Sequence, residues 1–574
     1  MNNQQTQGVS QERDPRDPRS KLTGPKSWFK DAGLGIFIHF GLYTLVGGNE
    51  NDHVGKGPKA YRDELMGRFN PERFDGSEWV RQIKASGASY LVITSKHGEG
   101  FCLWPTDVHD YHVGNTPFKR DIIGELAEAC HSQSFRFGIY HASDSWYYEE
   151  NDELEQTPEA YSAYVGGMID ELTTRYGEVC ELWLDGSTPL LPPEKLGPIL
   201  ERARGNQPAM VINDRGVKQD EYGLPFGDFV TPERFFPVAV DPGHEFIEIC
   251  DAMGMRGWGY HNEQHFHSGS SLVYRFCHAR SLGANYLLNV EPSPEGVIRE
   301  ECVTRLEVLG RFNGAHPHAA LRAGASTAVP TEPFEQNRYV LGRTTRAGNT
   351  LYVHLERPPR GDWVELRGVH GKVMRAYVED ASGGAGASLA ALTTDEGIEL
   401  RGLPATFSEP NPVVAVEFER EPSLPASFAP APRPVRVEAE LPTYVPSQAA
   451  ALVASYGGVS WHLYETYANG AETVGRWVHN SSKIVWKLSV VNAGRYRLFA
   501  YLGTSELQAG AVARFEASGK HVDFTTVATG HYTEAHGHEI GTLALEAGEV
   551  ELTLSSPKTE HFFPNVHHLI LQPA

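Results

Sequence analysis

The sequence predicts an α/β protein, a (β/α)8 TIM-like barrel followed by two antiparallel β-sandwich domains. Strand-like apolar runs alternate with amphipathic helical stretches from about residue 27 to 315, a rhythm typical of a parallel sheet with covering helices. About seven or eight such units over that length favour a closed barrel over an open sheet. After about Ala323 the helical periods end, and short runs separated by Gly and Asn turns predict antiparallel sheets.

The helical stretches of the first half carry apolar stripes. We expect helices over Asp75–Ser86, Lys119–Ser132, Ser268–Leu282 and Val297–Phe312, with a buried strand over Asn285–Val290 between the last two. The first helix begins with Asp75, a good N-cap, and repeats apolar residues at helical spacing through Trp79 and Ile83. Helices with one apolar face suit the outer layer of a barrel.

Changes in composition divide the chain into five segments. We expect a disordered leader over 1–24, the barrel over 25–322, a small β-sandwich over 323–420, a proline-rich linker over 421–434 and a jelly roll over 435–574. The leader is polar and lacks the apolar core of a secretory signal. Localisation is therefore expected to be cytoplasmic, or else stays unknown.

Charge and cysteine content exclude several classes of function. The formal net charge of −22 argues against a nucleic acid or anionic membrane partner, because both require clustered Lys and Arg. No apolar run approaches the roughly 20 residues that span a bilayer. The six cysteines have no CxxC spacing, which favours buried free thiols over disulfides or a zinc knuckle.

Five apolar runs in the first half each lead to a residue that can do chemistry. They are 36–38 before His39, 90–94 before His97, 137–140 before His141, 182–184 before Asp185, and 210–212 before Asn213-Asp214-Arg215. Such runs suit strands buried on both faces, and barrels carry their active sites where the strands end. Five endings in series predict a catalytic face.

Two carboxylates stand out near these endings. Asp185 directly follows three apolar residues, where an acid is costly to bury without a role, although a helix N-cap is an equally good explanation for it alone. Glu233 follows the next predicted strand, and two carboxylates on neighbouring barrel loops are what glycoside hydrolysis requires. Glu99, Asp144 and Glu248 are alternatives at similar depth.

The histidines allow two interpretations. His39, His97 and His141 end three different strands, where they could hydrogen-bond sugar hydroxyls or bind a metal together with Asp185. A His-x-His on the first strand or a His-Glu-x-x-His helix would favour metal, and the sequence has neither. The histidines of segment 261–267 precede a helix rather than sharing one of its faces, so we expect no metal and no other cofactor. Trp258, like Trp104 and Trp146, could stack on a sugar or belong to the core.

Ten motifs in order resemble those of the retaining α-L-fucosidases, glycoside hydrolase family 29. They are WFKDAGLGIFIHFGLYT (28–44), FNPERFDGSEW (69–79), TSKHGEGFCLW (94–104), KRDIIG (119–124), FGIYHASDSW (137–146), LWLDG (182–186), NDR (213–215), GDFVTPE (227–233), GWGY (257–260) and NYLLNVEP (285–292). The resemblance covers the predicted barrel. It implies hydrolysis of terminal α-L-fucosides by double displacement, with a fucosylated oligosaccharide or glycoconjugate as partner.

The resemblance also implies roles for single residues. Asp185 matches the catalytic nucleophile and Glu233 the general acid/base, with Glu248 as the second choice. His39, His97, Arg215 and Trp258 match positions that line the sugar pocket, and His141 falls on or beside a position usually held by Tyr.

Two departures from the family pattern affect substrate identity. The family commonly has Lys-His-His-Asp-Gly-Phe, and here Gly98 replaces the second histidine. A Glu-Trp pair after the first strand has no obvious counterpart in segment 59–61. A related sugar of the L-galactose type, a glycan-binding pseudoenzyme and a metal-dependent barrel hydrolase therefore stay open as alternatives.

The last unit resembles a carbohydrate-binding jelly roll, on the strength of its Val-Glu-Ala-Glu opening at 437–440. Trp461, Tyr464 and Tyr467 are its candidate glycan contacts. Packing against the barrel or formation of a homo-oligomer is an equally good expectation.

Overall fold

We analysed a computed structural model of the 574-residue chain. It describes residues 22–574 except 49, 52–57, 217–226, 235, 237–238, 241–245, 329, 335–336, 357–358, 360, 408, 426–434, 438–441, 447–449, 454–458, 461–463, 467–471, 475–482, 505–508, 530–534, 556 and 558–564. Residues 1–21 of the expected leader, most of the expected linker and the candidate glycan contacts Trp461 and Tyr467 lie outside the described residues. The expected leader extends too far, because Leu22 is buried in the barrel cluster and a 3-10 turn begins at Gly24. Tyr464 begins a short strand, but its side chain is not described.

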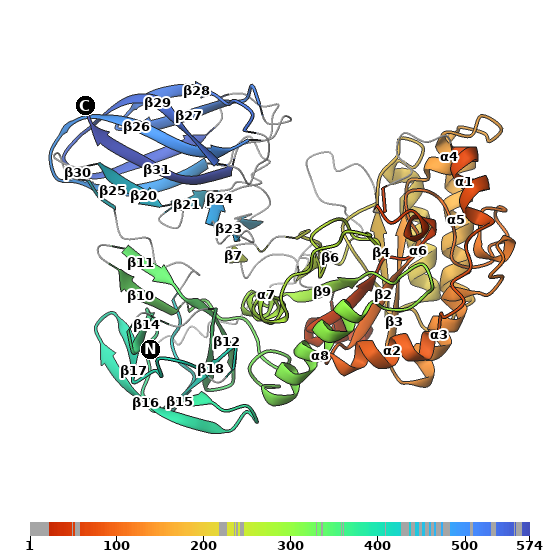
Figure 1. The fold of residues 1–574 in the computed structure, drawn as a ribbon, viewed down its shortest axis with the longest axis horizontal. Coiled ribbons are helices and arrows are strands. Elements are labelled where there is room, and N and C mark those ends of the chain that lie inside the picture. Colours follow the sequence, from red (N-terminus) through yellow and green to blue (C-terminus); the bar gives the residue numbers. More distant parts are fainter. Residues whose placement is uncertain are drawn as a thin grey trace, which may run out of the picture.

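The first unit is built on a parallel sheet of eight strands (Figure 1). The strands are β1 (Leu34–Ile38), β2 (Tyr90–Lys96), β3 (Arg136–Ala142), β4 (Glu181–Asp185), β5 (Val211–Ile212), β6 (Phe229–Val230), β8 (Phe246–Ala252) and β9 (Asn285–Val290). They are ordered β5-β4-β3-β2-β1-β9-β8-β6. A parallel bridge between Asn213 and Phe229 joins the two ends of this order. The predicted α/β barrel is therefore confirmed.

Helices cover the outside of the barrel. The larger ones are α2 (Gly76–Ala85), α3 (Ile122–Ser132), α5 (Pro158–Thr174), α6 (Pro193–Asn206), α7 (Gly269–Ser281) and α8 (Glu300–Ala315), with the shorter α1 (Pro58–Met66) and α4 (Trp146–Glu149) and the 3-10 turns η2 (Gly24–Asp31), η3 (Leu42–Leu45) and η4 (Val113–Asn115). Asp75 caps α2 by accepting from the Glu78 backbone N–H. Asp121 caps α3 in the same way, so this helix begins three residues later than the sequence predicts.

Alternation along the strands separates two apolar layers. Phe37, Tyr140 and Trp183 belong to the cluster inside the barrel. Their strand neighbours, such as Ile139 and Leu182, belong to the larger cluster between the strands and the helices. Because successive strand residues face opposite sides, the parity of a residue decides whether it can reach the barrel interior.

The second unit is a nine-stranded antiparallel sheet with a core of its own. Its strands are β10 (Pro330–Phe334), β11 (Asn337–Val340), β12 (Gly342–Ala347), β13 (Thr350–Leu355), β14 (Trp363–Arg367), β15 (Val373–Glu379), β16 (Ala385–Thr394), β17 (Gly397–Arg401) and β18 (Val413–Phe418). Its order is β11-β10-β14-β17-β16-β15-β18-β13-β12. We propose that this sheet corresponds to the expected segment 323–420.

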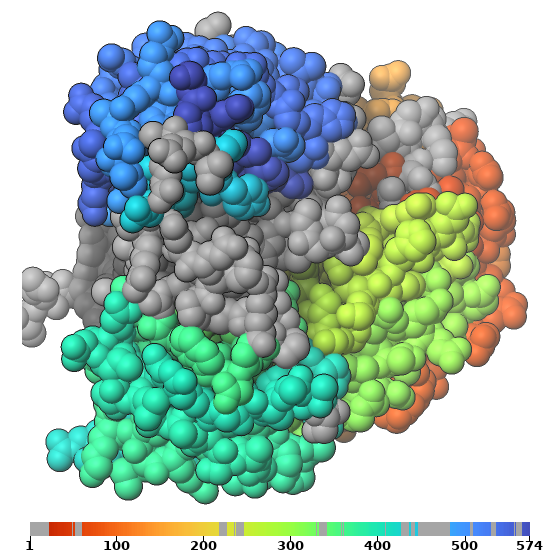
Figure 2. Space-filling model, turned by 60° about the vertical axis from the view of Figure 1, so that its left-hand side comes forward, coloured from red at the N-terminus to blue at the C-terminus, as the bar shows by residue number. Residues whose placement is uncertain are grey.

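The third unit consists of two packed six-stranded sheets around a separate core. The first contains β19 (Val435–Val437), β21 (Ala450–Val453), β25 (Lys483–Val490), β27 (Val512–Ala517), β28 (Lys520–Thr525) and β30 (Gly548–Ser555). The second contains β20 (Thr443–Pro446), β23 (Tyr464–Thr466), β24 (Glu472–Val474), β26 (Gly494–Gly503), β29 (Ala535–Leu545) and β31 (Asn565–Pro573). We propose that this sandwich is the expected 435–574 unit. In the space-filling view the barrel, the second unit and the third unit occupy separate parts of the surface (Figure 2).

A short two-stranded sheet connects the barrel with the third unit. It pairs β7 (Ala239–Val240), from the segment between β6 and β8, with β22 (Val459–Ser460). Among the described residues, no helix is long and apolar enough to cross a membrane. The six cysteines are unpaired and buried.

Candidate active site

Most of the predicted site residues gather at the carboxyl ends of the barrel strands. Asp185 is the last residue of β4, and Arg215 and Glu233 follow β5 and β6. His39 and His97 follow β1 and β2 directly. Parallel strands all end on the same face of a barrel, so residues far apart in sequence converge there.

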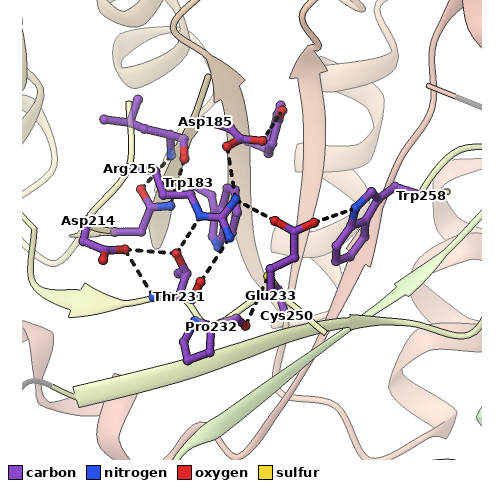
Figure 3. A network of polar contacts seen from close by, with 12 residues as sticks. Trp183, Asp185, Asp214, Arg215, Thr231, Pro232, Glu233, Cys250 and Trp258 are labelled. Carbon is purple, nitrogen blue, oxygen red and sulfur yellow. Dashed lines mark hydrogen bonds and ion pairs between the residues drawn. The ribbon is translucent and has the colours of Figure 1, made fainter. Parts of the chain in front are cut away.

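Arg215 lies between the two predicted catalytic carboxylates (Figure 3). Its Nη1 is 3.2 Å from Oδ1 of Asp185 and 3.0 Å from Oε2 of Glu233. Thr231 holds the other side of the guanidinium, because Nε donates to its Oγ1 at 2.9 Å and Nη2 to its carbonyl at 3.0 Å. The guanidinium carbon also lies 4.7 Å from the ring centre of Trp183. Arg215 is therefore fixed in one orientation, with Nη1 directed at both acids.

The surroundings of Asp185 keep it ionised. Burial by itself would raise the pKa of this carboxyl, but the charge of Arg215, His97 and the backbone N–H of Gly186 act together against it, and the pKa lies below its usual value. The hydroxyl of Tyr140 donates to Oδ2 at 3.0 Å and adds to this effect. The side chain is still one-third exposed, at 33%. A partly exposed carboxylate that stays charged has the properties of a nucleophile.

Glu233 has contacts at both of its oxygens. Oε2 accepts from Arg215, and Oε1 accepts from the indole Nε1 of Trp258 at 3.2 Å. Because Glu233 and Asp185 share one nitrogen of Arg215, their nearest oxygens are separated by no more than the two hydrogen bonds combined. This bound admits the about 5–5.5 Å between the carboxyl groups of retaining glycosidases. The two carboxylates therefore lie close enough to act on the same bond of a substrate.

His39 is held in one tautomer by a neighbouring amide. The Nδ2 of Asn289 donates to the carbonyl of Trp258 at 2.7 Å, so its Oδ1 is the acceptor that faces Nδ1 of His39 at 2.8 Å. The His39 ring is thus protonated on Nδ1 and carries a lone pair on Nε2. It also stacks on Trp258 with ring centres 5.2 Å apart. Burial lowers the pKa of His39 to about 4, so the ring is neutral at physiological pH.

His97 stacks on Tyr140, with ring centres 5.6 Å apart and nearly parallel planes. Burial also lowers its pKa to about 4. Nδ1 of His97 lies 3.8 Å from Oε2 of Glu99, a fully buried carboxyl whose pKa burial raises to about 8. His97 and Tyr140 together form one wall beside Asp185.

The prediction for His141 is wrong. Its side chain faces the outer layer of the barrel, where Nδ1 lies 3.1 Å from Oγ of Ser95 and the ring lies near Trp104. Strand alternation explains the error, because the preceding residue, Tyr140, is the one that faces inward and bonds Asp185. Tyr140 therefore takes the place that the sequence interpretation gave to His141.

Glu248, the second choice for the acid/base, lies too deep in the barrel for that role. It is fully buried and accepts hydrogen bonds from the hydroxyl of Tyr90 and from the indole Nε1 of Trp183. Trp183 precedes Asp185 by two positions on β4, so its ring separates Glu248 from the site. Trp104 is likewise a core residue, whose indole donates to Glu171.

Glu50 is a residue of the site that the sequence interpretation missed. Its buried carboxylate accepts from the backbone N–H groups of Trp258 at 2.7 Å and Gly259 at 2.9 Å. Burial raises the pKa of Glu50, but these bonds and the neighbouring His97 and His39 bring it below its usual value. Glu50 therefore fixes the loop that carries Trp258. Glu50 lies outside any helix or strand, so its position in the loop after the first strand was the only signal in the sequence that could have pointed to it.

The structure gives no support to the metal alternative from the residues it describes. Within the described ranges, no group of three or more His, Cys, Asp or Glu side chains is placed to hold a metal ion. In segment 261–267, the ring Nδ1 of His261 instead accepts from the backbone N–H of Glu263 at 3.0 Å.

The sequence and the fold are similar to those of known proteins. The sequence model of the alpha-L-fucosidase family matches residues 2–316. Tissue alpha-L-fucosidase of Rattus norvegicus is 24% identical over 369 residues, which cover 58% of this chain and 77% of that protein. Alpha-L-fucosidase isoenzyme 1 from Paenibacillus thiaminolyticus superposes with a TM-score of 0.60 at 26% identity, over 70% of this chain and all of that one.

A second solved structure extends the likeness beyond the barrel. Alpha-L-fucosidase from Vibrio sp. strain EJY3 has a TM-score of 0.67 at 21% identity, and the superposition covers 96% of this chain and 98% of that one. The family match itself spans more than half of the chain. The chain belongs to the alpha-L-fucosidase family of glycoside hydrolases.

Proposed function

We propose that this protein is a retaining exo-glycosidase that removes terminal α-L-fucosyl residues from fucosylated oligosaccharides or glycoconjugates. The observation that carries the proposal is the pair of carboxylates, Asp185 and Glu233, joined by one nitrogen of Arg215. The choice of fucose as the sugar rests on membership of the alpha-L-fucosidase family. A relative from Bacteroides thetaiotaomicron was solved as a trapped covalent intermediate in complex with 2-fluoro-fucosyl fluoride.

In the first step Asp185 attacks the anomeric carbon and forms an ester with the sugar. The bond from that carbon to the glycosidic oxygen breaks, and Glu233 gives its proton to the departing oxygen. Ester formation removes the charge of Asp185. Arg215 is then left to stabilise the carboxylate of Glu233, the form required of a general base.

In the second step Glu233 takes a proton from a water molecule that attacks the same carbon. The ester bond breaks, the sugar leaves with its original anomeric configuration, and Asp185 regains its charge. In the free enzyme Tyr140 and Arg215 donate hydrogen bonds to the Asp185 carboxylate. They stabilise this carboxylate again when the ester bond to the sugar breaks.

Neutral ring groups contribute to recognition of the sugar. Nε2 of His39 carries a lone pair that accepts from a sugar hydroxyl, because its Nδ1 proton is used by Asn289. His97 and Trp258 offer ring nitrogens and ring faces next to the two acids. A neutral wall of this kind suits a neutral sugar better than a charged ligand.

The test is hydrolysis of an activated aryl α-L-fucoside, followed by NMR from the first turnovers. We expect α-L-fucose as the first product, before mutarotation. Asp185→Ala should abolish turnover, while the exposed Glu150→Ala should not. First appearance of the β anomer would contradict the retaining mechanism. Absence of any turnover would favour the pseudoenzyme, and loss of activity on chelation would favour a metal-dependent hydrolase.

A further inference from the structure

Gly98 leaves an open space at the edge of the site. It follows His97, whose ring lies against Tyr140. A Cβ built on Gly98 would have only one side chain within 4 Å among the described residues, the carboxylate of Asp144, with Oδ2 at 3.6 Å and Oδ1 at 3.9 Å. The space that a larger residue would fill is therefore bounded by Asp144.

Asp144 lies beside the nucleophile. Its carboxylate packs so closely on Gly186, the residue after Asp185, that a Cβ on Gly186 would overlap it. Gly186 has a φ of +65°, a conformation that favours glycine. The Ser143 N–H donates to the carbonyl of Asp185 at 2.6 Å and fastens the two strand ends together. Asp144 is thus held at a fixed place next to Asp185.

The carboxylate of Asp144 has no hydrogen-bond donor among the described residues. Lys96, at the end of β2, donates to the main-chain oxygen of Asp144 at 2.6 Å and not to its carboxylate. Burial raises the pKa of Asp144, and the nearby charge of Asp185 adds to this effect. Asp144 is partly exposed, so its carboxylate can still accept a hydrogen bond, and a ligand that brings a hydroxyl group would supply the donor.

We propose that Asp144 is a specificity-determining residue whose carboxylate accepts a hydrogen bond from a hydroxyl of the sugar attacked by Asp185, in the space that Gly98 leaves open. The proposal rests on the proposed function and deepens it. The ligand it selects is a sugar with a free hydroxyl on this edge, rather than a deoxy or O-alkylated one. A site that bonds a substrate hydroxyl discriminates strongly against the analogue that lacks it.

The test combines two variants with a series of aryl α-L-fucosides, each lacking one ring hydroxyl. Asp144→Ala and Asp144→Asn should lower kcat/KM for the parent fucoside by about 10- to 100-fold, the usual range for a hydrogen bond to a charged group. For one monodeoxy substrate, kcat/KM of the same variants should be close to that of the wild-type protein, because the hydroxyl that bonds Asp144 is already absent. Glu150→Ala, an exposed acid nearby in sequence, serves as the control.

Gly98→Ala tests the same proposal independently. Its methyl group fits at ordinary contact distance from Asp144 but takes up the space, so it should lower kcat/KM for the parent more than for that same monodeoxy sugar. Unchanged kcat/KM in the Asp144 variants, or an equal loss for every sugar, would overturn this inference alone. A wild-type protein that hydrolyses no fucoside would overturn the proposed function and this inference with it.

Discussion

Asp185 and Glu233 approach one another through a single atom, Nη1 of Arg215, which is 3.2 Å from the first carboxylate and 3.0 Å from the second. The three residues come from the ends of three consecutive strands, β4, β5 and β6. The arginine therefore couples the charges of the two acids. Any change that alters one of them changes the field at the other.

The acid/base assignment to Glu233 predicts chemical rescue. Glu233→Ala should keep partial activity on an aryl fucoside with a good leaving group, because that step needs little protonation, and azide should accelerate turnover by replacing the activated water. Formation of a fucosyl azide, followed by NMR, checks this. Glu248→Ala is the matched comparison, and rescue of that variant but not of Glu233→Ala would move the role to Glu248.

Arg215 sets the acid limb of the pH profile. Because its charge lowers the pKa of Asp185, the nucleophile stays ionised as pH falls, and kcat/KM decreases only below the usual aspartate range. Arg215→Gln removes the charge, so the pKa of Asp185 rises and the acid limb moves to higher pH. The measurement is kcat/KM against pH for both proteins. An acid limb at the same pH in both would contradict the coupling.

Substitution of a site histidine should lower kcat/KM without changing how kcat/KM depends on pH. Burial lowers the pKa of His39 and of His97 to about 4, so both gain charge only as pH falls through about 4. His39→Gln removes one hydrogen bond and should lower kcat/KM about 10-fold. Its pH profile above 5 should keep the wild-type shape. Loss of an inflection near pH 6.5 in the variant would show that His39 titrates during catalysis.

A buried pair of acids beneath the site predicts pH-dependent stability. Glu181 and Glu248 are both fully buried, and burial raises the pKa of each, that of Glu248 to about 7. This pair therefore binds more protons in the folded protein than in the unfolded chain between about pH 4 and 7, and its contribution to the free energy of unfolding falls as pH rises through this window. Glu181→Gln removes one charge and should flatten the fall.

The midpoint of thermal unfolding at pH 5 and at pH 8 measures this effect. Glu178→Gln, an exposed acid three residues earlier, is the control and should retain the wild-type difference. The same difference between the two pH values in all three proteins would contradict the raised pKa values of the pair.

Much of the barrel follows from the sequence, for physical reasons that are easy to state. The apolar runs before Asp185 and Arg215 are long enough to be buried on both faces, and only a parallel sheet covered by helices does this. The positions of Glu233 and Trp258 came from the motif resemblance, because spacing alone does not distinguish one loop acid from another. Their predicted catalytic and binding roles remain proposals.

The sequence was less informative about which individual residues face the site. A shift of one residue along β3 exchanges Tyr140 for His141 on the inner face. An apolar run does not show which of its alternate residues face inward. Glu50 lies in a segment without helical or strand periodicity, and its role depends on a long-range contact with the loop at Trp258. The place of Asp144 depends on its contacts with Gly98 and Gly186, which the motifs name without showing which side chain lies against them.

The central claim is that Asp185 forms a covalent bond with the sugar, and trapping that bond tests it most directly. Incubation with 2-fluoro-fucosyl fluoride, digestion and mass spectrometry should find one fluorofucosyl group on the peptide that contains Asp185. The Asp185→Asn protein should carry none. Label on a different residue, or no label on an enzyme that still hydrolyses aryl fucosides, would contradict the account.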